Sequence, residues 1–119
     1  MVIGAAVSES GALASLAADY RRALLLWQEE VNASGGMLGR PVELRLQDDQ
    51  SDATRTGELY AQFIREKADL LIGPFGSAAT LMAGAEAERA QRVLINGAGS
   101  SLAVHKRAPR YMFQTAIPK

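Results

Sequence analysis

Short apolar runs and longer amphipathic stretches follow one another along the chain. The runs at residues 2–7, 69–72 and 93–95 are largely apolar, which is typical of strands buried on both faces. Residues 42–47 instead alternate apolar with charged or polar side chains, so this strand is expected near an edge of the sheet. A fifth strand is predicted at residues 111–115.

The stretches between these strands have the helical period. Residues 12–33 repeat apolar side chains every three or four positions, which predicts one face packed in the core. That face comprises Leu13, Leu16, Tyr20, Leu24, Trp27 and Val31. Helices are also predicted at about residues 53–67, with Ser51 or Asp52 as N-cap, and at residues 78–91. A short helical turn is expected near residues 102–106.

Strands that alternate with helices predict an α/β fold with a doubly wound, mostly parallel sheet, flavodoxin-like strand order and helices on both faces. The length of 119 residues fits one domain. In such sheets ligands bind beyond the carboxyl ends of the strands, where the strand order reverses. The loops at that edge follow Val7, Gln47, Ile72 and Ile95.

Composition and charge exclude several classes of function. Thirteen basic residues balance thirteen acidic ones, so there is no electrostatic footprint for nucleic acid. The chain has no cysteine and a single histidine, His105, which excludes thiolate catalysis and multi-histidine metal sites. No apolar run reaches the roughly 18 residues of a membrane helix. We expect neither a cofactor nor a metal.

Two glycine-rich loops carry the candidate chemistry. The third strand leads through Gly73 and Pro74 to Ser77 and Thr80, in the expected first turn of a helix. A helix N-terminus leaves N–H groups unpaired and attracts anions, so these two hydroxyls and the nearby backbone could bind a carboxylate. The loop at residues 96–101 leaves the adjacent strand, and its carbonyls could accept from an ammonium group. The alternatives are that Ser77 is only an N-cap and that the second loop is only a flexible connection.

Asp48 and Asp49 follow the second strand and could serve as a general acid and base, a metal site or a ribose contact. We favour turn formation and capping, because further metal ligands do not converge on them. Nucleotide binding would need a G-x-G-x-x-G pattern after the first strand, where Gly11 stands alone. A phospho-acceptor domain would need acids after the first strand and an aspartate after the third, and neither Glu9 nor Gly73 fits well.

Several segments resemble one family in order and spacing. The stretch EVNASGGMLGRPVEL at residues 30–44 resembles a characteristic turn of the type I periplasmic binding proteins for branched-chain amino acids and related ligands. Residues 48–52 are similar to the acidic turn of that family, and residues 72–80 and 97–100 to its third- and fourth-strand exits. Residues 111–115 resemble the strand before its next helix, so the resemblance covers essentially the whole chain.

The resemblance implies a periplasmic or extracellular solute receptor that serves the membrane permease of an ABC importer and performs no catalysis. A sensory or regulatory ligand-binding domain of the same fold is the alternative. By position, Ser77 would bond the ligand carboxylate, Ala98 would offer its carbonyl to the ammonium, and Ser100 would contact the head group. Residues bordering the ligand or its side chain would be Phe75, Gly76, Ser10 and Leu16.

The family folds as two α/β lobes with the ligand clamped between them. Residues 1–119 resemble only the first contiguous part of the N-terminal lobe, without the second lobe. Apolar surface meant for the remaining segments would then be exposed, so the chain is expected to self-associate.

Overall fold

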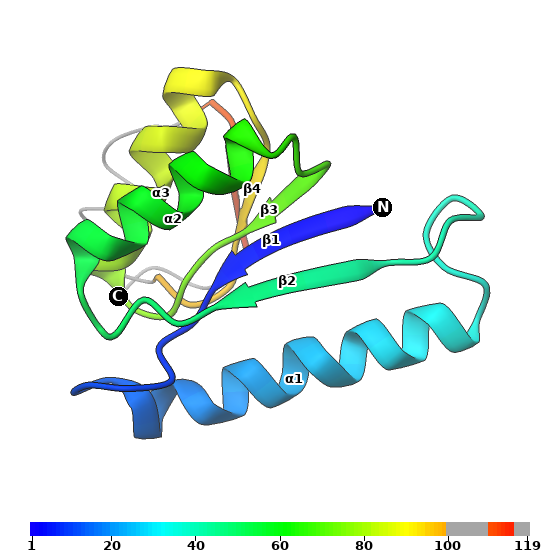
Figure 1. Cartoon of the computed structure of the whole chain (residues 1–119), viewed down its shortest axis with the longest axis horizontal. Coiled ribbons are helices and arrows are strands. Elements are labelled where there is room, and N and C mark those ends of the chain that lie inside the picture. Colours follow the sequence, from blue (N-terminus) through cyan, green and yellow to red (C-terminus); the bar gives the residue numbers. More distant parts are fainter. Residues whose placement is uncertain (100–109, 116–119) are drawn as a thin grey trace.

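The computed structural model describes residues 1–99 and 110–115. In chain order the elements are β1 (Val2–Ala6), α1 (Ala14–Ala33), β2 (Glu43–Gln47), α2 (Ala53–Arg65), β3 (Leu70–Ile72), α3 (Ser77–Ala90), β4 (Leu94–Asn96) and β5 (Met112–Gln114). Within these residues five parallel strands form one sheet in the order β2-β1-β3-β4-β5. The predicted doubly wound fold is confirmed. Its strand order reverses between β1 and β3 (Figure 1).

The two faces of the sheet are covered unequally. Helices α2 and α3 lie side by side on one face, and α1 lies along the other (Figure 1). The buried cluster between the sheet and the α2–α3 pair includes Leu59, Tyr60, Phe63, Leu71 and Leu94. Contact there is close, since a Cβ atom on Gly4 of β1 would lie 2.6 Å from the ring of Phe63. The core therefore sits between the sheet and α2–α3.

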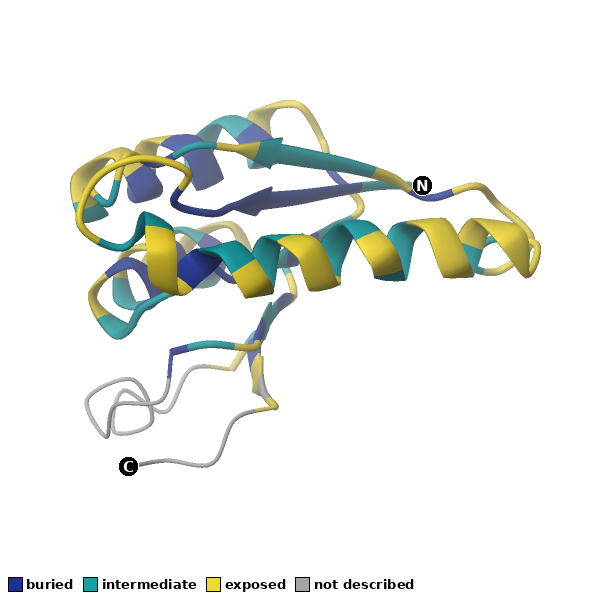
Figure 2. Cartoon of the chain, turned by 90° about the horizontal axis from the view of Figure 1, so that it is seen from below, coloured by how far each residue is buried: buried dark blue, intermediate teal, exposed yellow. Residues whose placement is uncertain are grey.

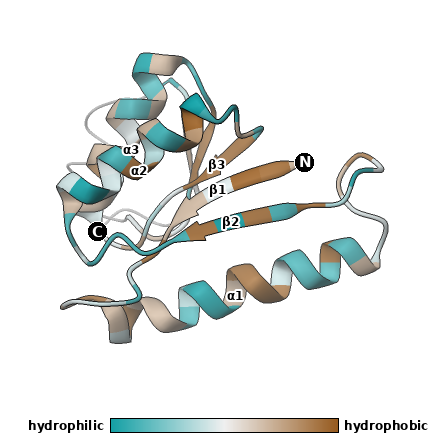
Figure 3. Ribbon diagram, viewed as in Figure 1, coloured by the Kyte–Doolittle hydropathy of each residue, from teal (hydrophilic) through white to brown (hydrophobic). Residues whose placement is uncertain are grey.

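Helix α1 covers its face only in part. Ala17 is the buried residue of the helix, and the rest of α1 is half-buried or exposed (Figure 2). Apolar and polar segments follow one another along α1 and along β2, whereas β1 and β3 are mainly apolar (Figure 3). Leu16, predicted on the packed face, is 65% exposed, because the first turns of α1 extend beyond the strand ends (Figure 1). Tyr20 and Trp27 are half-buried.

Element boundaries shift by a few residues from the prediction. Asp52 is the N-cap of α2, as predicted, and accepts hydrogen bonds from the N–H groups of Thr54 and Arg55. Helix α3 begins at Ser77 with Gly76 as its N-cap, so the alternative in which Ser77 is the cap is wrong. The predicted turn at residues 102–106 lies outside the described residues. In the part of the chain that is described, each helix is too short or too polar to cross a bilayer.

Candidate functional site

The loop between β3 and α3 presents backbone to the carboxyl edge of the sheet. Gly76 has φ +99° and ψ +148°, a conformation that favours glycine. Its carbonyl accepts from the N–H of Thr80 at 3.0 Å and from the Thr80 hydroxyl at 2.7 Å. Thr80 is fully buried, and its hydroxyl stabilises the start of α3 through this bond to Gly76. The first turn of α3 directs its N–H groups out of the helix end.

The loop after β4 is shaped by one buried amide. Asn96 Oδ1 accepts from the N–H groups of Gly99 at 2.8 Å and Ala98 at 3.3 Å, and its Nδ2 donates to the Gly99 carbonyl at 2.7 Å. A Cβ atom on Gly99 would lie 2.3 Å from Thr80 Oγ1. The two glycine-rich loops therefore touch, which confirms their predicted adjacency. Ser100 and Ser101 lie outside the described residues.

A pocket of about 220 Å³ opens beside the N-terminus of α3, at the point where the strand order reverses. Such reversal points are where open α/β sheets bind ligands. The lining residues come from the exits of three strands and the starts of the helices that follow them: Ser8, Leu13, Asp49, Ser51, Ala53, Gly76, Ser77, Ala78 and Ala79.

The pocket includes residues that the sequence analysis missed as site residues. Ser8 directly follows the first apolar run, and this position could have marked it. Leu13 was placed only in the packed face of α1. The pocket lies on the β1 side of Ser77, whereas Ala98 lies beyond it, on β4's side of the sheet. Ser77 thus stands between the pocket and the second loop.

The exit of β2 is closed by its own side chains. Asp49, almost fully buried, accepts from the Ser8 hydroxyl at 2.6 Å, the Thr56 hydroxyl at 2.7 Å and the Ser51 N–H at 3.0 Å. These bonds agree with the structural role preferred for this residue. In the described residues, no three His, Cys, Asp or Glu side chains gather as a metal ion would require.

The carboxylate of Asp48 also accepts hydrogen bonds from neighbouring residues. Partial burial acts to raise its pKa, but hydrogen bonds from the Glu9 N–H, the Ser10 hydroxyl and the N–H groups of Gln50 and Ser10 lower the pKa overall. The Ser10 hydroxyl donates to Asp48 Oδ2 at 2.7 Å. Ser10, a predicted neighbour of the ligand side chain, is exposed. Its hydroxyl is hydrogen-bonded to the β2 exit.

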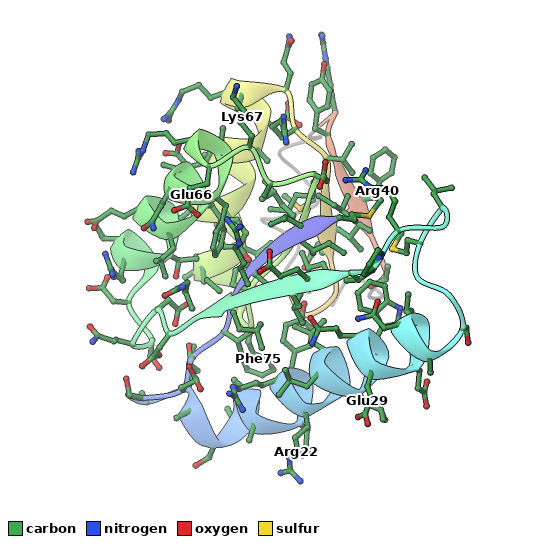
Figure 4. All side chains as sticks on the ribbon, turned by 45° about the vertical axis from the view of Figure 1, so that its right-hand side comes forward. Arg22, Glu29, Arg40, Glu66, Lys67 and Phe75 are labelled. Atoms are coloured by element: carbon green, nitrogen blue, oxygen red, sulfur yellow. The ribbon has the colours of Figure 1, made fainter. Side chains whose placement is uncertain are left out.

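The side chain of Phe75 fills the space between the β3 exit and α1. Its ring centroid lies 6.3 Å from that of Tyr20. Figure 4 shows Phe75 between the sheet and α1, whereas Arg22 and Glu29 point from α1 into solvent. Half-buried Phe75 thus packs between the β3–α3 loop and α1.

These features agree with the comparisons to known proteins. A family model described as "Periplasmic binding protein" matches residues 1–117. The chain belongs to this family of binding proteins.

Among solved structures, the chain is similar to the branched-chain amino acid transporter substrate binding protein LivJ from Streptococcus pneumoniae, in complex with isoleucine. The identity is 27%, the TM-score is 0.92, and the match covers 99% of this chain and 34% of that one. An ABC-type branched-chain amino acid transporter from Rhodopseudomonas palustris CGA009 matches at 26% identity and TM-score 0.86, over 98% and 32% of the two chains.

A solute binding protein of an ABC transporter from Rhodopseudomonas palustris BisB5, in complex with 3,4-dihydroxy benzoic acid, shares the fold at 24% identity and TM-score 0.84. That match covers 99% of this chain and 32% of the other. The chain thus spans about a third of the length of the proteins it resembles.

Proposed function

We propose that this chain is part of a solute receptor that binds a small amino-acid-type carboxylate for an ABC importer. Family membership supports binding over catalysis, and two matched structures hold carboxylate ligands. The coverage of about a third supports the assignment of residues 1–119 to the first part of an N-terminal lobe. The protein would act in the periplasm or outside the cell, with the membrane permease as its partner.

The observation that carries the proposal is the glycine-capped start of α3 beside a pocket at the strand-order reversal. The ligand carboxylate would lie against Ser77 and the N–H groups of residues 78 and 79, where the helix end is positive. The ammonium would lie towards the carbonyl of Ala98, with Ser100 at the head group. Leu13 and Leu16 would be close to the ligand side chain.

Replacing Ser77 with alanine tests the carboxylate contact. In the full-length receptor we expect the affinity for the preferred ligand among L-leucine, L-isoleucine and L-valine to fall about tenfold, because a charge-assisted hydrogen bond is lost. Titration calorimetry measures this. Ser15→Ala, at an exposed position in the first turn of α1, is the matched control and should bind as the wild type does. Equal affinity in Ser77→Ala and wild type would remove Ser77 from the site.

A sensory domain of the same fold is the second candidate. The family match and the pocket are common to both, so the segments encoded beside this chain in its gene discriminate them. A second lobe with a secretion signal favours transport, and a DNA-binding or membrane-spanning segment favours sensing.

We also propose that the isolated chain self-associates. Phe113 of β5 is 56% exposed and Leu26 of α1 is 55% exposed, both on the sparsely covered side of the sheet. Burying such side chains is favourable. Light scattering across a concentration series should show dimers or larger species, and Phe113→Asp should reduce them. A monomer at millimolar concentration would contradict this proposal.

A further inference from the structure

Two tyrosines hold the end of β3 from opposite faces of the sheet. Tyr20, on α1, donates its hydroxyl hydrogen to the carbonyl of Gly73 at 2.7 Å. Tyr60, on α2, donates to the carbonyl of Ile72, the preceding residue. Since α1 and α2 lie on different faces (Figure 1), two consecutive carbonyls are fixed by two separate helices.

The position of Tyr60 follows from the reversal of strand order. The register of β1 against β3 ends at the pair Ala5 and Ile72. Beyond it the N–H of Ala6 donates to the Tyr60 hydroxyl at 3.1 Å, and that hydroxyl donates to Ile72. The phenol thus replaces a direct hydrogen bond between two strands that separate. Without it, a buried N–H and a carbonyl would lose their partner, which is costly.

Tyr20 reaches both loops of the candidate site. Its ring packs against Phe75, with centroids 6.3 Å apart, just before Gly76. On the other side, a Cβ atom on Gly97 would lie 3.2 Å from the Tyr20 hydroxyl oxygen. One side chain of α1 therefore contacts the β3 exit and the β4 exit together.

We propose that Tyr20 and Tyr60 form a clamp that fixes the β3 exit, and that they are positioning residues for the ligand site. The clamp sets where residues 76–79 present their N–H groups and where residues 97–99 present their carbonyls. Hydrogen-bonding sites bind well only when their groups are held in place before the ligand arrives. The ligand part of this inference rests on the proposed function, but the clamp itself does not.

Both phenols stay hydrogen-bond donors at neutral pH. Burial raises the pKa of Tyr20 to about 12 and raises that of Tyr60 well above its ordinary value. The clamp is therefore intact over the whole physiological range.

Tyr20→Phe tests the clamp, because it deletes one oxygen atom and keeps the ring against Phe75. Tyr111→Phe is the matched control, since it deletes the same atom from a half-buried tyrosine next to β5. Amide hydrogen exchange is measured by mass spectrometry on the full-length receptor at micromolar concentration, because the isolated chain is expected to self-associate. In Tyr20→Phe we expect exchange at residues 75–79 and 97–99 to accelerate about tenfold relative to the core strands. The control should show wild-type rates there.

Binding is measured on the same full-length variants by titration calorimetry with L-leucine, L-isoleucine and L-valine. We expect Tyr20→Phe to weaken binding about fivefold or more, and Tyr111→Phe to leave it unchanged. Wild-type exchange rates in the two loops of Tyr20→Phe would overturn the clamp, and so would equal acceleration in Tyr111→Phe. Faster loops with unchanged affinity would overturn the positioning role.

The two proposals fail in different ways. If the wild-type full-length receptor binds none of the three amino acids, the proposed ligand class is wrong, while the exchange rates still decide the clamp. Tyr60→Phe adds a second measurement. Because it orphans two buried groups, we expect a larger loss of stability than for Tyr20→Phe.

Discussion

The exits of β2 and β3 line the same pocket but are built in different ways. At the β2 exit, Asp49 accepts from Ser8, Ser51 and Thr56, and Asp48 accepts from its own neighbours. At the β3 exit the N-cap of α3 is Gly76, which has no side chain to bond the N–H groups of the first turn. The carboxylates of the β2 exit are therefore occupied by hydrogen bonds within the protein, whereas the β3 exit presents backbone N–H groups at the pocket.

This difference explains why the most conspicuous polar residues are poor guides to the site. Two adjacent carboxylates attract attention, but here they stabilise a turn. A ligand carboxylate would be repelled by them and attracted by the helix end. Asp49 borders the pocket on the β2 side, so a ligand carboxylate would lie on the α3 side.

The largest expected effect is at the β2 exit. Asp49→Ala leaves the Ser8 hydroxyl and the Ser51 N–H without their acceptor, while the Thr56 hydroxyl keeps the Asp52 carbonyl at 3.0 Å. It should lower the unfolding free energy by about 3 kcal/mol. Urea unfolding followed by fluorescence of Trp27, the single tryptophan, measures this. Asp52→Ala, which removes an exposed N-cap, is the comparison and should cost about 1 kcal/mol. Equal losses in the two variants would show that the Asp49 network contributes little.

The next effect, at the β3 exit, depends on high pH. The pKa of Tyr20 is raised from 10.0 to about 12 in the folded chain, so its stabilisation is complete below pH 10 and is lost as the pH rises towards 12. The full loss is on the order of 2 kcal/mol. The unfolding free energy should therefore decrease more between pH 9 and pH 11.5 in the wild type than in Tyr20→Phe. Parallel profiles of unfolding free energy against pH for the two proteins would contradict this contribution of Tyr20.

The smallest expected effect on stability is at Gly76, where comparison with a second glycine separates backbone strain from a direct effect on binding. Gly76→Ala forces alanine into φ +99° and should cost about 1–2 kcal/mol. Gly35→Ala is the control, since its φ is +102° and open space surrounds it far from the pocket. We expect similar thermal shifts for both variants, but weaker binding of amino acids only for Gly76→Ala. Weakened binding in both would assign the effect to global stability.

Local periodicity was sufficient for much of the fold. The change between short apolar runs and helical repeats predicted the five strands and three helices that residues 1–99 and 110–115 contain, and the alternation at residues 42–47 predicted an edge strand. Adjacency of the two glycine-rich loops followed from the parallel order, and the contact of Gly99 with Thr80 confirms it. The direct ligand contacts of Ser77, Ala98 and Ser100 stay predictions.

The sequence by itself determined the α/β order, the parallel sheet and the edge at which a ligand could bind, because these depend on periods of two and 3.6 residues within short windows. Only the tertiary structure decided which polar groups are already occupied. Ser8 meets Asp49 across 41 positions, and Tyr20 meets Gly73 across 53. Such partners are set by how helices dock on the sheet. For this reason the packing assigned to Leu16 was wrong, and the tyrosine contacts with β3 were not foreseen.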